Sequence, residues 1–539
     1  MPSSKSWIHV KSVAALGVLL VALIVLLPAL SGCQRESRGK TLRVSLASDI
    51  RSTQFGVNRD ENTDTVLHHV VEGLVAYRED LTVGPLLAES WEVSEDGRSY
   101  TFTLRPGLRF HNGQVVTASD VKWSWEYLLN PRNRWLCRNW YDGTGETGIR
   151  ILKIETLDEQ TVRFELTEPN YLFLARMAHM VCLCGIIHRD SLDAHGNWIM
   201  PIGTGPYRIV RWNRRKSIEL ERFADYQPLP GARDGYAGRR EAFFDRIEFL
   251  VIPDASVAEF ALLSGSIDIA PKMPAEVLPA LARRKDVVPV LQPTLNWNVL
   301  LLQNEDPMLS DARMRRAIAH AINREQVAQN ATQGLAHANG SAVFPGSRYD
   351  SEFQRRVPEY DPSKARQLIR EAGYAGQPIR LQVNRQFQLD YSSAIIVAEM
   401  LRQIGLHVEL EVLDWATQLK NYNTGNYQMM SIGFSARPDP TLMFDIFIGD
   451  RKKRSNVVFS DPAVVVKLRR SGLVTDPVER QRLFDEIHAA ADADSSLIGL
   501  FNHTILDAVR ADIINYSSWP LARPRFWGVS RQMTEGGEQ

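Results

Sequence analysis

The chain has 539 residues, 44% of them hydrophobic, and its 63 basic residues balance its 63 acidic ones. A chain of this length exceeds a single hydrophobic core, so we expect roughly two or three domains. The balanced charge lacks the basic excess of nucleic-acid-binding proteins, so we expect no nucleic-acid partner. Four cysteines in the whole chain are too few for a disulfide-rich scaffold.

The N-terminus has the pattern of a secretory signal. Lys5 and Lys11 precede an apolar run over residues 13–27, and small residues then lead into Cys33. The string Leu-Ser-Gly-Cys resembles a bacterial lipobox, which implies removal of residues 1–32 and lipid attachment at Cys33. A membrane-spanning anchor is the alternative, since the apolar stretch approaches the length that crosses a bilayer. Either way, we expect the body of the chain outside the cytoplasm, in a periplasm or on the cell surface, and tethered to a membrane.

Alternating apolar residues mark a β-rich region after residue 85. The alternation covers 91–93, 100–104 and 108–110, and Asp-Gly, Pro-Gly and Asn-Gly pairs supply turns around these segments. We expect three strands in a meander. Thr117 follows with Asp120 three residues later, which predicts a capping box at the start of a helix.

Further helices and strands alternate along the rest of the chain. A strand is predicted over 41–48, and helices over 65–74, 255–264 and 311–322. The last of these has its apolar residues on one face, as in an amphipathic helix. No tandem repeat or low-complexity linker interrupts this order.

Residues 379–434 predict a β-α-β-α-β unit. Strands are expected over 379–383, 408–412 and 427–434, with helices over 392–404 and 415–422 between them. Such crossovers are right-handed and place the strands parallel. Ligands of open α/β sheets bind beyond the carboxyl ends of the strands, so this edge is the expected binding region.

Two arginines follow strands of this unit. Arg385 comes after the first strand and Arg437 after the third, so both guanidinium groups are candidates for ligand contact. The alternative is that either arginine pairs with a structural carboxylate such as Asp439. Trp415 and Phe434 are candidates for stacking on a ligand, although most aromatic residues in such folds belong to the core.

Several strings together resemble one family. Residues 85–120 read PLLAESWEVSEDGRSYTFTLRPGLRFHNGQVVTASD, followed by PIGTGPY at 201–207, LSGSIDI at 263–269 and a Tyr-Asp-Pro string at 360–373. These strings resemble, in order, the family 5 extracellular solute-binding proteins, the peptide-binding subunits of ABC importers. The resemblance implies a two-lobed α/β fold of the periplasmic-binding-protein type II class, with an extra β-rich subdomain in the first lobe. It also implies a monomer that is not an enzyme, needs no cofactor, and acts with a membrane permease and an ATPase.

The same resemblance divides the chain into domains. The first lobe would comprise residues 33–84 and 191–295, with a C-terminal return over 506–539. Its β-rich subdomain would cover 85–190, and the second lobe 296–505.

The loop after the third strand departs from the family pattern. Peptide binders commonly have Gly-Trp, then Ala-Asp, then Asp-Pro in this loop, and the aspartate meets the amino terminus of the peptide. Here Phe434 replaces the tryptophan, and Arg437 stands where the aspartate is expected. Arginine suits a carboxylate rather than an ammonium group. Arg385 also lies where dipeptide-binding relatives use an arginine for the peptide carboxylate. The sequence therefore favours a peptide or small ligand with an anionic or carboxylate-bearing end.

Two other functions and a metal site are the alternatives that the sequence leaves. A ligand sensor that acts through a receptor shares all these features, whereas an extracytoplasmic hydrolase is disfavoured because the usual nucleophile and metal motifs are missing. His179, Cys182, Cys184 and His188 have zinc-like residue types, but their surroundings are apolar, and the family has a buried strand here. We expect no metal, and at most one disulfide, from Cys137 to Cys182 or Cys184.

Overall fold

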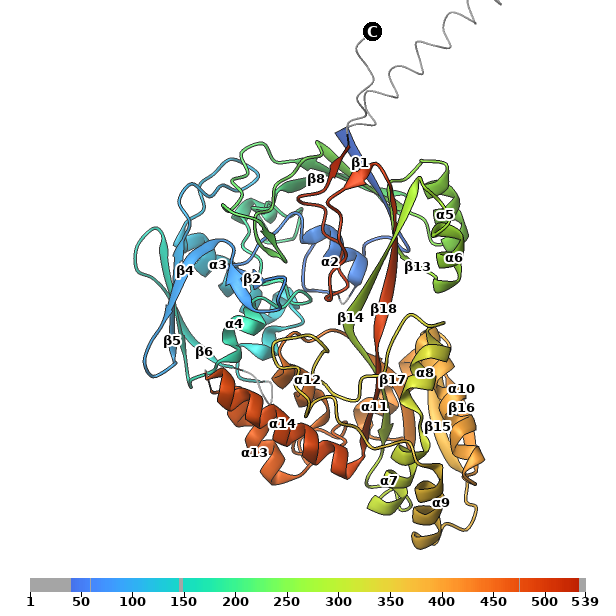
Figure 1. Ribbon diagram of the computed structural model, residues 1–539. Helices are drawn as coiled ribbons and strands as arrows, with labels where there is room; N and C mark the ends of the chain where they lie inside the picture. The colour runs from blue at the N-terminus through green and yellow to red at the C-terminus, as the bar shows by residue number, and fades with distance from the viewer. Residues whose placement is uncertain (1–39, 59, 145–148, 475, 533–539) are drawn as a thin grey trace, which may run out of the picture.

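The structure is a computed structural model that describes residues 40–58, 60–144, 149–474 and 476–532 (Figure 1). The predicted signal, its alternative as a membrane anchor, and Cys33 all lie outside the described residues. Within the described part of the chain, no helix combines the length and the apolar character needed to cross a bilayer.

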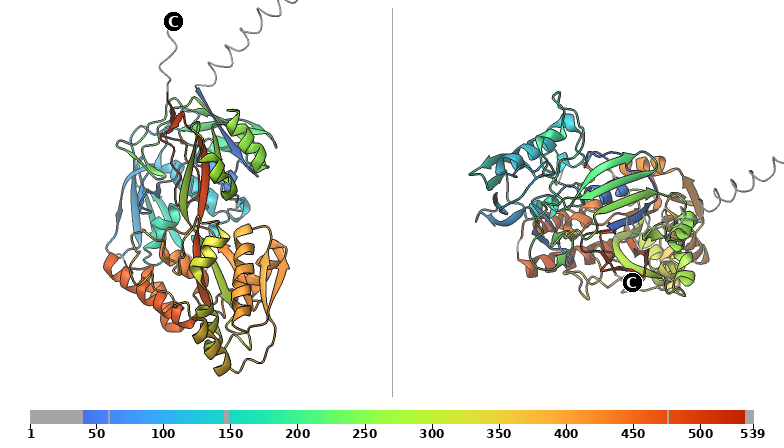
Figure 2. Two further views of the ribbon diagram at one scale, coloured as in Figure 1. Left: turned by 45° about the vertical axis from the view of Figure 1, so that its right-hand side comes forward. Right: turned by 90° about the horizontal axis from the view of Figure 1, so that it is seen from above.

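A ten-stranded mixed sheet extends through both lobes. Its order is β16 (Val408–Leu413), β15 (Ile379–Asn384), β17 (Met429–Phe434), β14 (Val287–Leu302), β18 (Leu497–Arg510), β13 (Ile269–Met273), β1 (Thr41–Leu46), β12 (Arg246–Val251), β9 (Ser217–Arg222) and β8 (Tyr207–Asn213). The long antiparallel strands β14 and β18 lie at its centre and run from one lobe to the other (Figures 1 and 2). Their pairing shifts register between Pro293 and Trp297, midway between the lobes. This fold confirms the predicted α/β class.

The first lobe carries the β-rich subdomain. Four antiparallel strands form its sheet in the order β4 (Ala88–Val93), β5 (Ser99–Leu104), β7 (Thr161–Leu166) and β6 (Ile151–Thr156). Helix α3 (Ala118–Leu129) packs on β6 and β7. The predicted capping box is present, because the carboxylate of Asp120 accepts the backbone N–H of Thr117 at 2.9 Å. A short hairpin of β2 (Val75–Tyr77) and β3 (Val83–Pro85) precedes this sheet.

Three local predictions were wrong. The segment 108–110 is not a strand of the meander but one side of a tight turn, which the backbone N–H of Phe110 closes on the carbonyl of Gln114. The helix expected over 65–74 is α2 (Glu61–Leu67), because the Asp60 carboxylate caps its N-terminus by accepting from the Thr63 N–H. The buried strand that the resemblance implies around residues 179–188 is replaced by turns, which follow the short helix α4 (Leu172–Met177).

Helices cover the faces of the sheet in both lobes. The first lobe adds α5 (Ala255–Leu263) and α6 (Leu278–Leu281), and the second lobe has α7 (Ala312–Ala321), α8 (Arg324–Ala331), α9 (Pro362–Glu371), α10 (Gln388–Gln403), α11 (Trp415–Thr424), α12 (Pro440–Phe447), α13 (Pro462–Ser471) and α14 (Pro477–Asp494). Separate hydrophobic clusters lie on the two faces of the β15–β17 sheet. Ala436 and Leu442, just after β17, pack instead into the cluster of the first lobe. The two lobes therefore meet at the loop that carries Arg437.

Candidate functional site

The β-α-β-α-β prediction is confirmed in topology. Strand β15 pairs parallel with β16 on one side and with β17 on the other. Their carboxyl ends therefore open on one edge of the sheet, where the loops carrying Arg385 and Arg437 begin. Strand β17 also pairs with β14, so its loop is the one beside the strands that connect the lobes.

Arg437 lies between the lobes. Its Nη1 donates to the carbonyls of Ser435 at 3.1 Å and Ala436 at 3.0 Å, and the side chain is half-buried. The loop is itself held by Asn296 of β14, whose Oδ1 accepts the Ala436 N–H at 2.9 Å. Burial raises the pKa of the Tyr77 hydroxyl in the first lobe well above its usual value, and the Arg437 charge opposes that rise. The neighbouring Ala436 packs into the core cluster of the first lobe, so the loop brings Arg437 to the contact between the lobes.

Arg385 lies in a more open position. It is exposed, its Nη2 donates to the Tyr391 hydroxyl at 3.3 Å, and its guanidinium carbon lies 5.2 Å from the centre of the Tyr391 ring. Tyr391 follows on α10, which begins directly after this loop. The contacts of Arg385 are therefore local to its own loop and helix.

The two aromatic candidates are partly packed against the core of the second lobe. The ring of Trp415 meets that of Phe387 edge-on, with their centres 4.9 Å apart. The Phe434 ring lies 4.7 Å from Phe447 and 5.6 Å from Tyr422, again edge-on. Both side chains remain half-buried, so each leaves part of its surface accessible.

Asp439 pairs with an arginine that the sequence did not indicate. Nη2 of Arg480 on α14 lies 2.9 Å from each carboxylate oxygen of Asp439, and the arginine side chain is only 1% exposed. Tyr171 of the first lobe covers this guanidinium, with the ring centre 4.3 Å from its central carbon. The N–H of Tyr171 also donates to the carbonyl of Gly472 at 2.9 Å. This pair therefore links the Arg437 loop to α14 and to the first lobe.

A buried polar group lies under the edge of the sheet. The Asp390 carboxylate accepts from Asn298 Nδ2 and from the Gly433 N–H, each at 3.1 Å, and burial raises its pKa to about 7. Burial lowers the pKa of the nearby His503 imidazole to about 4, and the charge of Lys272 acts in the same direction. A Cβ atom at Gly433 would lie 3.0 Å from the Asp390 carboxylate, so a larger residue here would have to push that carboxylate aside.

A charged cluster of the first lobe was also missed by sequence reasoning. Glu61 at the start of α2 pairs with Lys272 and with Arg523, whose Nη1 lies 2.6 Å from Glu61 Oε1. Burial raises the pKa of the neighbouring Asp64 to about 7, against the opposing charge of Arg523. No local pattern signals this cluster, since its members come from three distant segments.

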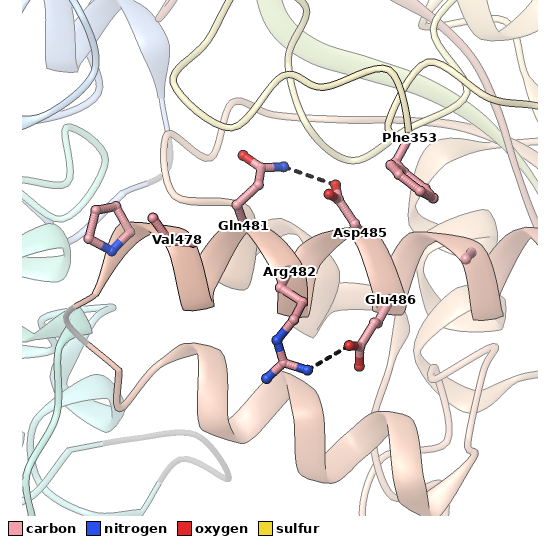
Figure 3. A pocket seen from close by; sticks show the side chains of 8 residues that line it. Phe353, Val478, Gln481, Arg482, Asp485 and Glu486 are labelled. Carbon is pink, nitrogen blue, oxygen red and sulfur yellow. Dashed lines mark hydrogen bonds and ion pairs between the residues drawn. The ribbon is translucent and has the colours of Figure 1, made fainter.

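Two hollows differ in their chemistry. One, of about 250 Å³, lies between the lobes, and its wall includes Asp439 and Arg480. The other is a groove on the outer face of α14 (Figure 3). In the groove, Gln481 donates to Asp485 at 2.9 Å and Arg482 to Glu486 at 2.7 Å. Its polar groups thus pair along one helix, so we do not assign the ligand to it.

The cysteine region contains a disulfide. Cys137 is bonded to Cys182, which is one of the two predicted pairings, and Cys184 is a buried free thiol. Burial raises the pKa of that thiol to about 12, so it is protonated at neutral pH. Among the described residues, no group of histidine, cysteine and acidic side chains is arranged to hold a metal ion.

Comparison with known proteins identifies the family. The model of the bacterial extracellular solute-binding proteins, family 5 Middle, matches residues 82–454. The glutathione-binding protein GsiB of Salmonella typhi is 26% identical over 525 residues, which cover 95% of this chain and 96% of that protein. The dipeptide-binding protein of Escherichia coli K12 is 25% identical over 503 residues, covering 88% and 90% of the two chains.

Solved structures share the two-lobed fold. The binding protein AgaA of A. tumefacien R10, in complex with agropinic acid, has a TM-score of 0.73 and 26% identity, covering 92% of this chain and 99% of AgaA. NikA from Brucella suis, in complex with Fe(III)-EDTA, has a TM-score of 0.79 and 22% identity, covering 91% and 100%. The chain thus belongs to the bacterial extracellular solute-binding proteins of family 5, which are extracytoplasmic, non-enzymatic binding proteins of ABC importers for peptides and related ligands.

Proposed function

We propose that this protein captures a peptide or small ligand with an anionic or carboxylate-bearing end between its lobes, and delivers it as a monomer to a membrane permease and its ATPase. The ligand class is inferred from the position of Arg437. It lies at the carboxyl edge of β17, between the lobes, where the family pattern has an aspartate. Its planar guanidinium is suited to a carboxylate through paired hydrogen bonds.

Two relatives support an anionic ligand. GsiB is a glutathione-binding protein, and glutathione is a carboxylate-bearing peptide. AgaA holds agropinic acid in its structure. Arg385, Trp415 and Phe434 are proposed as further contacts, because part of each side chain is accessible at the carboxyl ends of the parallel strands. Arg385 follows β15, Phe434 ends β17, and Trp415 follows β16 and meets Phe387 of the β15 loop.

Hinge closure is the proposed mechanism of capture. The support is that β14 and β18 pass from lobe to lobe and that their pairing shifts register between Pro293 and Trp297. A break in a ladder is a natural place for a bend. A ligand that contacts both lobes stabilises the closed form by its higher affinity for that form. We keep the division into a first lobe of 33–84, 191–295 and 506–539, with 85–190 as its subdomain, and a second lobe of 296–505.

Attachment to the membrane through lipid at Cys33 completes the proposal. It rests on the signal-like order of residues 1–32 and on the Leu-Ser-Gly-Cys string. Mass spectrometry of the mature N-terminus tests it, since a chain that still begins upstream of Cys33 contradicts it.

Calorimetric titration with peptides tests the ligand class. We expect peptides with a free carboxylate to bind the wild type more tightly than their amides. Arg437→Ala should weaken carboxylate binding by about 2–5 kcal/mol, because a desolvated charge would lose its partner. Equal affinity of the variant and the wild type would refute the role of Arg437. Unchanged uptake of a labelled ligand after deletion of the protein would favour the sensor over the transporter.

A further inference from the structure

The cavity of about 250 Å³ between the lobes has walls from both of them. Tyr77, Val83 and Tyr171 line it from the first lobe, and Tyr349 and Arg480 from the second. Pro438 and Asp439 also line it, so the cavity borders the loop that carries Arg437, although Arg437 itself is not part of its wall. A group attached to a ligand held by Arg437 would therefore have this space next to it.

The polar groups deep in the cavity already have partners. The Tyr77 hydroxyl donates to the Ala175 carbonyl at 2.8 Å, and the Tyr349 hydroxyl accepts from Arg480 Nη1 at 2.9 Å. Arg480 and Asp439 neutralise each other. The Tyr171 and Ser347 hydroxyls are the side-chain groups of the lining that could still pair with a polar ligand group, so a charged group that entered here would lose its water without gaining an opposite charge, which is unfavourable.

The charges of the lining also balance at its exposed rim. Asp80 and Arg348 are both exposed, and the charge of Arg348 helps to hold the pKa of the Asp80 carboxyl below its usual value. Asp80 also accepts from the N–H of Thr82 at 2.9 Å. The lining thus contains two acidic residues, Asp80 and Asp439, and two basic ones, Arg348 and Arg480, so it has no excess charge.

The remaining wall is apolar and aromatic. Leu81, Val83, Leu174 and the rings of Trp91 and Tyr171 are half-buried there, so each offers accessible surface. An aromatic or branched aliphatic group of the ligand would cover this surface and remove it from water, at about 25 cal/mol for each Å² of apolar area.

We propose that this cavity is a subsite for an aromatic or branched aliphatic group of the ligand whose anionic end is bound by Arg437. The inference rests on the proposed function and narrows its ligand class. Because Tyr171 and Val83 belong to one lobe and Arg480 and Tyr349 to the other, the subsite is complete only when the lobes are together. Filling it therefore favours the closed form.

The test uses four N-acetylated dipeptides with glutamate last and phenylalanine, leucine, glycine or lysine first. Titration of the full chain should show the phenylalanine and leucine peptides binding at least about tenfold more tightly than the glycine peptide, from the added apolar burial. The lysine peptide should bind no better than the glycine peptide. Equal affinities of all four would overturn the subsite while leaving the proposed function standing.

Two variants fill the cavity from independent elements, Ala175→Phe from α4 and Val83→Trp from β3. Each should reduce the preference for phenylalanine over glycine to about one, with little change in binding of the glycine peptide. Ala489→Phe, in the groove on α14, is the matched control and should keep the wild-type preference. A preference that survives in both filled variants would also overturn the subsite.

Indole provides a readout that does not depend on the peptide. Ligand-observed NMR should show indole binding to the wild type and to Ala489→Phe, and no binding to Ala175→Phe or Val83→Trp. If no peptide binds but indole follows this pattern, the subsite stands and the carboxylate ligand is wrong. If indole binds all four proteins alike, or none, and no peptide preference is seen, the subsite is wrong.

Discussion

The loops after β15 and β17 follow the same sequence logic but have different structural surroundings. Each leaves the carboxyl end of a parallel strand, and each carries an arginine. Arg385 is exposed and contacts Tyr391 of its own helix. Arg437 is half-buried, and its charge acts on Tyr77 of the opposite lobe. The strand ends place both arginines at one edge of the sheet, but the neighbouring strands decide which of the two loops meets the first lobe.

The cause of the difference is the place of each strand in the sheet. Strand β15 lies between β16 and β17 and is flanked only by its own lobe. Strand β17 pairs with β14, which continues into the first lobe. The loop after β17 is also held at its far end, where Asp439 caps α12 and pairs with Arg480. Arg437 is therefore held in place from two sides, and Arg385 is not.

The largest expected effect comes from removing Arg480. Arg480→Met leaves the buried Asp439 carboxylate without its cation, so we expect the free energy of unfolding to fall by about 3–5 kcal/mol. Denaturant unfolding followed by circular dichroism measures the change. The matched control is Arg482→Met on the same helix, whose side chain is 60% exposed and pairs with Glu486. The free energy of unfolding of the control should fall by at most about 1 kcal/mol. An equal fall in both variants would contradict a stabilising role for the buried Asp439–Arg480 pair.

A smaller effect is expected from the buried carboxyl beneath the β17 loop. Asp390 keeps its proton up to about pH 7 in the folded protein, whereas the ordinary value of 3.8 applies once it is unfolded. The folded state therefore binds more protons between these values, and this carboxyl lowers stability as the pH rises from about 4 to about 7.

Asp390→Asn should remove that contribution. Unfolding in urea at pH 5 and pH 8 should show that the free energy of unfolding falls by about 2–3 kcal/mol more in the wild type than in the variant between these pH values. Asp64, whose pKa is also about 7, keeps part of the dependence in both proteins. Glu352→Gln, at an exposed carboxyl, is the control and should follow the wild type. Identical pH dependence in wild type and Asp390→Asn would show that the carboxyl titrates normally.

The smallest effect is expected at Arg385. Because its guanidinium is exposed and water screens its charge, Arg385→Ala should weaken binding of a carboxylate peptide by less than about 1 kcal/mol. Calorimetric titration with the carboxylate peptide, as for Arg437→Ala, measures this loss of affinity. A loss at Arg385 as large as that at Arg437 would mean that the two loops contribute alike and that the contrast between them does not hold in the bound state.

Much of the scaffold was predictable because its signals are local. Thr117 and Asp120 lie three residues apart and predict their helix, and the apolar alternation of residues 379–383 predicts β15, where Ile379, Leu381 and Val383 are all buried. The predictions of the start of α2 and of a strand at residues 108–110 were wrong because other local signals outweigh the apolar pattern there. Asp60 starts α2 earlier than the apolar pattern suggested, and a turn interrupts the alternation at residues 108–110.

The sequence by itself determined the family, the α/β class, the parallel unit after residue 379 and the edge on which Arg385 and Arg437 lie, because each depends on residues that are neighbours along the chain. The tertiary structure alone decided that Arg480 pairs with Asp439 across 41 residues, that Cys182 and not Cys184 bonds Cys137, and that Tyr171 closes over Arg480 from the other lobe. These contacts join segments whose approach depends on how the whole sheet is ordered, and no short stretch of sequence records that order.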